Sequence, residues 1–237
     1  MRAGEVQGVS ETKNTSIAEL ASQMVGREVF LQVKKDEAKP EEEILNVEDL
    51  WVHDARGLLA VKGVSLNIRK GEIVGIAGVE GNGQSELVEA LTGLRKTSQG
   101  SINYLGENIA SSTPKNIRRK KIAHIPEDRT NTGLNTQLSI WENLIGNSYF
   151  RKPLSTNGIF NLKKIAQHSN KLKEDFDIRA PNISLKVKSL SGGNQQKVVV
   201  ARELSEDPVL TIASQPTRGV DIGNIEAIHE QLVQMRD

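Results

Sequence analysis

The sequence contains no cysteine, few aromatic residues and almost no excess of charge of either sign. Without cysteine the chain can form no disulfide and perform no thiol chemistry. Its 31 basic and 30 acidic side chains leave a net charge of +1, so no overall field favours nucleic acid or an anionic membrane surface. No apolar run approaches the length that spans a bilayer, and the first residues lack the apolar core of a signal peptide.

The remaining composition is that of an ordinary globular protein, with 37% hydrophobic and 26% charged residues. The 237 residues suffice for one large domain or two small ones. Near the start, TSIAELASQMVG predicts a short helix that Thr15 or Ser16 caps, with Glu19 in its first turn and Gly26 after its end. The charged stretch VKKDEAKPEEE then indicates a solvated linker, and a new unit begins near Ile44.

This second unit contains the order strand, glycine loop, helix. ILNVEDLWV and LLAVKGVSLNI alternate apolar and polar residues, as half-buried antiparallel strands do. The apolar run from Ile73 to Ala77 predicts a strand that is buried on both faces. Glycines follow, and apolar residues then recur at helical spacing, at Leu87, Val88, Leu91 and Leu94. In this context a glycine pattern is a credible phosphate site.

The glycine loop, GVEGNGQS at residues 78–85, matches the phosphate-binding pattern G-x-x-x-x-G-K-[ST] except that Gln84 replaces the lysine. Backbone N–H groups and the start of the next helix can converge on a phosphate, and the Ser85 hydroxyl could bind Mg²⁺. The attraction between a lysine ammonium and a phosphate charge is worth about 4 kcal/mol at a separation of about 4 Å and an effective dielectric near 20. A hydrogen bond from a neutral amide to a charged group is worth roughly 1.5–3 kcal/mol. We therefore expect weakened phosphate binding, and a turn without ligand is the alternative.

The string LSGGNQQK, from Leu190 to Lys197, stands just before a predicted helix and ahead of a second apolar strand. It resembles the signature motif of ATP-binding cassette (ABC) proteins. VSLNIRKGEIVGIAG, IAHIPEDR and VLTIASQPTRGVD likewise resemble the approach to Walker A, the Q-loop region and the Walker B strand with its D-loop. The resemblance implies an α/β fold with a P-loop NTPase core, an antiparallel β subdomain at about residues 44–68 and an inserted helical subdomain at about residues 133–188.

These motifs together look like the second cassette of a two-cassette ATPase that serves importers of simple sugars and nucleosides. RAGEVQG and TSIAELASQMVGREV look like the end of a preceding cassette. The resemblance thus implies three parts: residues 1–31 as the C-terminal tail of a first cassette, residues 32–43 as a linker, and residues 44–237 as a second cassette that stops before its last strands.

The resemblance also assigns catalytic positions, and several of them are altered. The Walker B positions of Asp and Glu hold Ser214, which brings no charge to Mg²⁺, and Gln215, which cannot take a proton from the attacking water. The Q-loop glutamine position holds Glu127. With Gln84, these changes predict a degenerate site with weak or absent Mg²⁺ and little or no hydrolysis by this chain alone. The nucleotide-binding positions would be Gly78, Glu80, Gly81, Asn82, Gly83, Gln84, Ser85 (also a weak Mg²⁺ ligand) and Glu86.

The signature, by contrast, is intact. In ABC ATPases the two cassettes pair head to tail, so that the signature of one cassette faces the phosphates bound by the other. The resemblance implies that this chain completes a partner's ATP site in trans, with Asp221 as the D-loop residue at the interface. The signature would contact the partner's γ-phosphate through a hydroxyl, backbone N–H groups and the start of a helix. These groups would come from Ser191, Gly192, Gly193, Asn194 and Gln195.

The expected function is therefore the ATP-binding subunit of a membrane importer, with a nucleoside slightly favoured over a simple sugar by QPTRGVD. Expected partners are a first cassette, permease subunits at the Q-loop and helical region, and indirectly a substrate-binding protein, all at the cytoplasmic face of the membrane. Two alternatives stay open: a module that binds no nucleotide, and a soluble ABC ATPase of DNA repair or translation. The run RRKK at residues 118–121 lacks interleaved aromatics and predicts solvated surface rather than nucleic-acid contact.

Overall fold

The computed structural model describes residues 5–26, 33 and 35–237, and it begins with a short 3-10 turn, η1 (Thr12–Asn14), and the helix α1 (Ile17–Val25). Ser16 and Glu19 cap α1 reciprocally, and Gly26 ends it with a φ of 84°. The predicted helix and its cap are thus confirmed. Within the predicted tail and linker, residues 1–4, 27–32 and 34 lie outside the described residues.

A four-stranded antiparallel sheet forms the β subdomain, in the order β2-β1-β3-β4. Its strands are β1 (Glu43–His53), β2 (Leu59–Arg69), β3 (Gln99–Tyr104) and β4 (Glu107–Asn108). The first two strands confirm the prediction, whereas β3 and β4 were not anticipated. One face of the sheet is apolar, and the helix α2 (Gln84–Leu91) packs on it through Leu87 and Leu91. The sheet therefore supports the start of α2, which follows the glycine loop.

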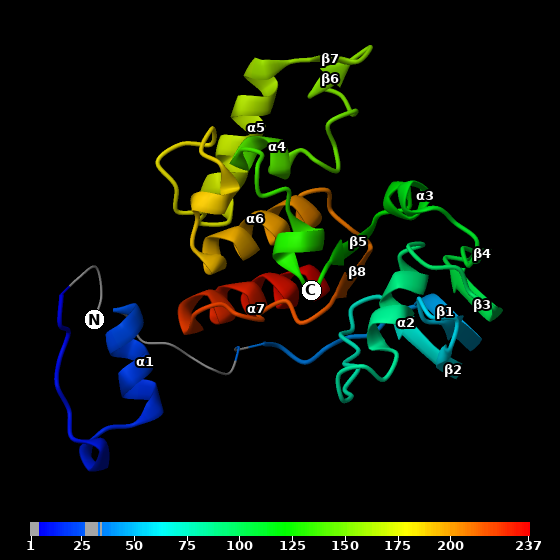
Figure 1. The fold of residues 1–237 in the computed structure, drawn as a ribbon, viewed down its shortest axis with the longest axis horizontal. Helices are drawn as coiled ribbons and strands as arrows, with labels where there is room; N and C mark the ends of the chain where they lie inside the picture. The colour runs from blue at the N-terminus through cyan, green and yellow to red at the C-terminus, as the bar shows by residue number, and fades with distance from the viewer. Residues whose placement is uncertain (1–4, 27–32, 34) are drawn as a thin grey trace.

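A second, parallel sheet joins distant parts of the chain. The strand β5 (Ile122–Ile125) follows the short helix α3 (Pro114–Arg119) and pairs with β8 (Leu210–Ala213). The helix α6 (Gly192–Leu204) lies between the helical subdomain and the last helix, α7 (Ile222–Arg236), as Figure 1 shows. Because α6 is covered on several sides, its residues Val198, Val199, Val200 and Ala201 are almost completely buried.

The helical subdomain, predicted at about residues 133–188, contains the helices α4 (Ile140–Leu144) and α5 (Leu162–Asp175). Ser139 and Glu142 form a capping box at the start of α4. An unanticipated hairpin lies between the helices, and two short turns flank them. These elements are β6 (Ser155–Thr156), β7 (Ile159–Phe160), the π-helical turn η2 (Arg129–Gly133) and the 3-10 turn η3 (Val187–Ser189).

The predicted buried strand at residues 73–77 is wrong. This segment has no strand assignment, and Ile73 and Ile76 are 58% and 55% exposed. An apolar run becomes a central strand only when neighbouring strands supply partners for its backbone N–H and C=O groups. Among the described residues, no strand pairs with this segment, since the parallel sheet consists of β5 and β8. Separately, the described helices include none that is long and apolar enough to cross a membrane.

Candidate nucleotide site and signature loop

The glycine loop reaches α2 through a close approach to the β subdomain. Gly83 has a φ of +99°, and a Cβ atom there would lie 2.5 Å from the carbonyl oxygen of Ala60 on β2. Only glycine combines this conformation with this contact. The start of α2, with its unpaired N–H groups and positive dipole end, is thereby fixed against the sheet, as a phosphate site requires.

Gln84, which replaces the lysine, folds back into its own loop. Its amide Nε2 donates a hydrogen bond of 3.0 Å to the carbonyl oxygen of Val79. A Cβ atom on Gly78 would lie only 2.1 Å from the same Nε2 atom, so the side chain fills the inside of the loop. The neutral amide therefore forms a hydrogen bond with the backbone of its own loop, and it offers a phosphate no positive charge.

The ends of β5 and β8 bring two of the sequence-predicted positions together. The Gln215 side chain donates a hydrogen bond of 2.9 Å from Nε2 to Glu127 Oε1. Arg218, which the sequence reasoning missed, forms an ion pair with the same carboxylate oxygen. Ser214 continues the ladder of the parallel sheet, since its N–H donates to the Ile125 carbonyl over 2.9 Å. The side chains of Gln215 and Arg218 thus both bind Glu127 across the ends of the two strands.

The residues at this site do not fit a tightly held Mg²⁺. Mg²⁺ prefers carboxylate and hydroxyl oxygens in near-octahedral geometry. Ser214 is neutral, and the nearby carboxylate of Glu127 is already engaged by Arg218. In the described ranges, no three His, Asp or Glu side chains gather in an arrangement that could hold a metal. The exposed Ser85 hydroxyl at the start of α2 is the remaining predicted ligand.

The signature loop has a well-defined helix start. Ser191 caps α6, because its hydroxyl oxygen accepts hydrogen bonds from the Asn194 backbone N–H (3.4 Å) and side-chain Nδ2 (3.0 Å). The Gln195 amide donates to the Leu190 carbonyl oxygen over 3.2 Å, and Gln196 donates to that of Pro216 over 2.8 Å. The predicted signature residues thus form one structured turn and the first turn of a helix.

The two signature glycines allow two neighbouring side chains to approach α6. A Cβ atom at Gly192 would lie 2.6 Å from Nη2 of Arg129, and one at Gly193 would lie 2.1 Å from Nδ2 of Asn224. Any larger residue at these positions displaces Arg129 or Asn224. The signature loop is therefore held between the segment after β5 and the start of α7.

The three charged residues of PEDR after β5 each have a structural partner. Asp128 caps η2. The hydrogen bonds that its carboxylate accepts from Asn131 and Thr130 lower the pKa of this carboxyl below its usual value. Arg129 Nη1 donates to the carbonyl oxygen of Arg218 over 2.8 Å. This motif therefore connects the Q-loop position, the signature loop and the segment that leads to the D-loop.

Asp221 starts α7. Its carboxylate accepts the Asn224 backbone N–H at 3.1 Å and the Asn224 side-chain amide at 2.6 Å. Asn224 in turn touches the signature loop beside Gly193. The D-loop position and the signature are hence parts of one packed unit, and Asp221 is its helix cap.

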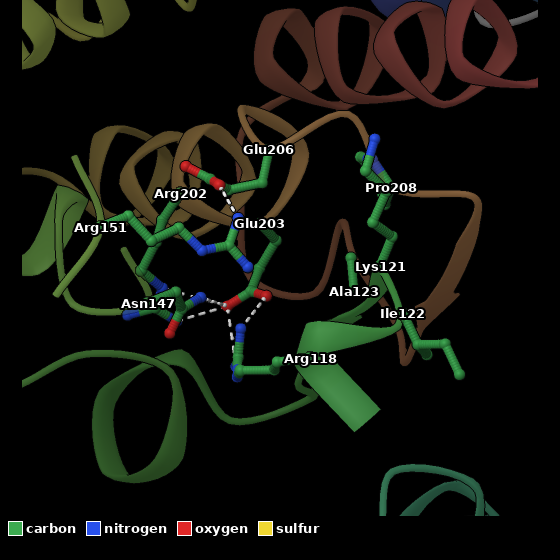
Figure 2. Close-up of a pocket in the computed structure, with 10 residues that line it drawn as sticks. All are labelled: Arg118, Lys121, Ile122, Ala123, Asn147, Arg151, Arg202, Glu203, Glu206 and Pro208. Carbon is green, nitrogen blue, oxygen red and sulfur yellow. Dashed lines mark hydrogen bonds and ion pairs between the residues drawn. The ribbon is translucent and has the colours of Figure 1, made fainter. Parts of the chain in front are cut away.

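At the other end of α6, a carboxylate receives several positive and polar groups (Figure 2). The Glu203 side chain is 1% exposed and pairs with Arg118 at 2.9 Å and Arg202 at 2.9 Å. Asn147 donates a further bond of 2.9 Å. Burial opposes the charge of Glu203, but Arg202 and Arg118 outweigh this and lower the pKa of its carboxyl. Glu203 thus joins α3, α6 and the segment after α4.

Sequence reasoning missed Arg129, Asn224, Glu203 and Arg218. Each acts through side-chain contacts between segments that are far apart in the chain, for example the 89 positions between Arg129 and Arg218. Such contacts leave no periodicity in the sequence. The charged triplet in PEDR was the available signal, because three consecutive charged residues after a buried strand require partners.

Within one chain, the signature loop and the glycine loop do not line a common site. Figure 1 shows the glycine loop, before α2, beside the β subdomain, whereas α6 begins at the opposite side of the molecule, next to the start of α7. A phosphate on the glycine loop is therefore out of reach of the Ser191 hydroxyl of the same chain.

Comparisons with solved structures agree with this architecture. A nucleotide-free ATP-binding cassette from an ABC transporter aligns with a TM-score of 0.67 and 25% sequence identity, over 82% of this chain and 78% of that chain. The described elements therefore have the arrangement of an ABC cassette, with its P-loop core, antiparallel sheet and helical part.

Curated relatives cover the whole chain. The nucleoside import ATP-binding protein NupA of Lactococcus lactis subsp. cremoris (strain MG1363) is 44% identical over all of this chain and 47% of its own length. The guanosine import ATP-binding protein NupO of Bacillus subtilis (strain 168) is also 44% identical, over 100% of this chain and 46% of its own length. The glucose import ATP-binding protein TsgD13 of Haloferax volcanii is 38% identical, over 100% of this chain and 43% of its own length.

The chain thus spans about half the length of the curated relatives it matches. The family model described as "ABC transporter" matches residues 61–218, which include the glycine loop, the signature and the end of β8. The chain belongs to the ABC transporter family.

Proposed function

We propose that this chain is the second ATP-binding cassette of an importer ATPase and that its signature loop completes an ATP site on a partner cassette. The observation that carries the proposal is the difference between its two loops. The signature loop is capped and held by Arg129 and Asn224, whereas Gln84 fills the glycine loop. Because the two loops lie apart in one chain, the signature needs a second cassette as its partner.

The signature loop offers groups that suit a γ-phosphate. Bound ATP would supply the phosphoryl group whose hydrolysis drives transport. The Ser191 hydroxyl can donate a hydrogen bond, since its oxygen accepts from Asn194 within the cap. The first N–H groups of α6 and its positive dipole end stabilise negative charge in front of the helix. Arg129 and Asn224 keep this turn in place.

The chain's own nucleotide site is degenerate in this proposal. The neutral Gln84 weakens binding of ATP, and the loss of charge at Ser214 leaves Mg²⁺ weak or absent. Gln215 cannot accept a proton, and its amide is bonded to Glu127. This site would hold nucleotide loosely, at residues 78–86, and would not hydrolyse it.

The partners follow from the same proposal. A groove of about 540 Å³ between η2 and α4, lined by residues that include Asn131, Leu138 and Asn143, offers a docking place for permease subunits beside the Q-loop position Glu127. A first cassette would face Ser191 and Asp221. Residues 1–31 would be the tail of that first cassette and 32–43 the linker, and the assembly would lie at the cytoplasmic face of the membrane, with a substrate-binding protein as an indirect partner.

The cargo that we propose is a nucleoside. Both relatives at 44% identity are named as nucleoside or guanosine import proteins, whereas the glucose import relative is 38% identical. Nothing in the composition favours nucleic acid as a partner, because the net charge is +1.

The in-trans role can be tested in the complete two-cassette protein by steady-state ATPase measurements. Ser191→Ala removes a hydroxyl donor from the partner's site, and we expect hydrolysis to fall roughly 10²-fold. Ser85→Ala, in the degenerate site, should leave the rate within about twofold. Since Ser191→Ala also removes a helix cap, the matched control is Thr113→Ala, whose hydroxyl caps α3 at the same 3.4 Å and lies outside the signature. Unchanged hydrolysis in Ser191→Ala would exclude the in-trans role.

A further inference from the structure

The outer end of the helical subdomain exposes an unusual share of the aromatic side chains. The chain has only two Tyr and four Phe, yet Tyr149, Phe150 and Phe160 are 49%, 46% and 45% exposed there. Ile159 and Leu162, which are 75% and 66% exposed, extend the same surface. We call residues 149–164 the tip. Figure 1 shows its hairpin, β6 and β7, and the first turn of α5 at the outermost end of the subdomain.

The charged side chains of the tip and of the residues that flank it in the sequence are all basic. Residues 143–173 include six Lys and Arg and no Asp or Glu, although the whole chain carries a net charge of only +1. Arg151 pairs with Glu206, and Lys171 pairs with Asp175. In the described part of the chain, no ion pair engages the exposed Lys152, Lys163 or Lys164. The apolar surface of the tip is therefore bordered by free positive charge.

The tip is an ordered structure. Ser155 pairs with Phe160 and Thr156 with Ile159 in the hairpin. Its two-residue turn, Asn157 and Gly158, has φ angles of 51° and 80°, as a tight hairpin turn requires. Beneath it, a separate small core forms from Ile145, Leu154 and Ile165, with Trp141 packed against it. The backbone therefore holds the apolar side chains outward.

Phe150 is fixed by its neighbours. Its ring meets Tyr149 edge to face at 5.4 Å between centroids, and the Arg151 guanidinium lies 5.8 Å from its centroid. Since Glu206, two residues after the end of α6, pairs with Arg151, the ring is connected to the body of the cassette. These contacts therefore connect the tip to the end of α6.

We propose that the tip binds the surface of a bilayer that contains anionic phospholipid. Aromatic rings favour the interface between headgroups and acyl chains, and aliphatic side chains such as Ile159 and Leu162 gain by insertion there. Lysines next to such a patch are attracted to anionic headgroups and extend their charges to the phosphates. The contact involves none of the nucleotide or signature residues, so it holds independently of the proposed ATPase role.

A protein partner fits the tip less well. Protein interfaces are depleted in lysine, whereas three unpaired lysines border this patch. The apolar residues also stand on a protruding hairpin and helix start, a shape that meets a broad surface without a matching groove. Both features suit a lipid surface, which supplies negative charge and a fluid apolar layer over a wide area.

Sedimentation with sucrose-loaded vesicles tests the proposal on the whole purified chain. One set of vesicles is phosphatidylcholine alone, and the other is three parts phosphatidylcholine to one part phosphatidylglycerol. We expect binding to the anionic vesicles at low salt, reduced by added salt, and little binding to the neutral ones. Ile159→Trp should report insertion directly through a blue shift of its fluorescence on addition of anionic vesicles.

Matched variants separate the tip from other surfaces. Lys163→Gln with Lys164→Gln should lower the partition coefficient about 30-fold, from about fivefold for each lysine. Ile159→Ser with Phe160→Ser should reduce binding at least as much, whereas the control Lys186→Gln with Lys188→Gln, two exposed lysines elsewhere, should change it less than about twofold. Melting temperatures should agree among all variants, because the altered side chains are exposed.

Three results would overturn the proposal. The first is no binding to anionic vesicles at low salt. The second is equal binding by the tip variants, which would place the contact on another surface, such as the exposed apolar residues 73–79. The third is cross-linking of a photoreactive residue at position 159 to a permease subunit and not to lipid, which would make the partner a protein.

Discussion

The glycine loop and the signature loop of this cassette differ in how much of the molecule supports them. The glycine loop and the segment before it are exposed, with Val79 at 74% and Ile73 at 58%. The signature leads into α6, where Val198 and Val199 are 0% exposed. One chain thus contains a half-site that is packed from several sides and another that is exposed except where Gly83 meets β2.

In the function that we propose, this difference corresponds to a division of work between the two loops. A phosphate-contacting turn must keep its N–H groups fixed if it is to stabilise charge that develops during a reaction. Arg129 and Asn224 fix the signature turn. The glycine loop has Gln84 inside it, so its interior is satisfied by its own side chain. The proposal therefore assigns chemistry on a partner to the signature loop and loose binding to the glycine loop.

The strongest way to break the comparison is to remove the carboxylate at the end of α6. Glu203→Ala leaves Arg202, whose side chain is 11% exposed, without its partner. We expect the free energy of unfolding to fall by about 3–5 kcal/mol, measured by urea denaturation. Glu206→Ala, which breaks the half-exposed pair with Arg151, is the control and should cost at most about 1 kcal/mol. Equal losses in the two variants would contradict this account of the packed side.

A pair of glycine substitutions compares the two loops directly. Gly193→Ala places a methyl group 2.1 Å from the Asn224 amide, and we expect it to cost about 1–3 kcal/mol of stability. Gly81→Ala has no atom within 4 Å, so it should cost about 1 kcal/mol, from its φ of +89° alone. Thermal and urea denaturation would measure both. A larger loss for Gly81→Ala would reverse the ranking of the two loops.

Gln84→Lys should strengthen the binding of ATP to the glycine loop. The new ammonium group adds positive charge inside the glycine loop, and we expect affinity for ATP to rise about tenfold in equilibrium titration. Gln137→Lys, a matched change on a loop of the helical subdomain, controls for overall charge. An unchanged affinity in Gln84→Lys would show that the lost lysine is not what weakens this site.

The pH dependence of stability tests the Glu203 cluster with the smallest change. The pKa of Glu203 is lowered from its ordinary 4.5 in the folded chain. Such a carboxyl stabilises the folded state when the pH is above its pKa in the unfolded chain. This contribution is lost as the pH falls through the lowered pKa of the folded chain. We expect the free energy of unfolding to fall below about pH 4.5, and to fall less steeply in Glu203→Gln. Identical slopes would remove Glu203 from the account.

Much of the fold follows from local sequence patterns. The capping box of Ser16 and Glu19, the alternation in β1 and β2, and the signature helix all depend on neighbouring residues, and each is present. The predicted strand at residues 73–77 failed because a buried strand depends on partners outside itself. Its hydrophobic residues alone could not indicate whether those partners are present.

The candidate site shows the same limit. Motif resemblance located Gln84, Gln215 and Glu127, and the structure brings the last two within 2.9 Å. It could not reveal that Arg129 contacts Gly192, because that contact joins segments on either side of the helical subdomain. Glu203 likewise reads as an ordinary polar position on α6 until the structure places Arg118 and Asn147 around it.

The central claim, that this cassette's own nucleotide site does not hydrolyse ATP, is tested most directly by titrating Mg-ATP into the purified chain and following phosphate release. The account predicts a dissociation constant above roughly 100 μM. It also predicts no release of phosphate above the background of a chain-free control. Steady-state hydrolysis by the chain alone, abolished by Ser85→Ala, would contradict it.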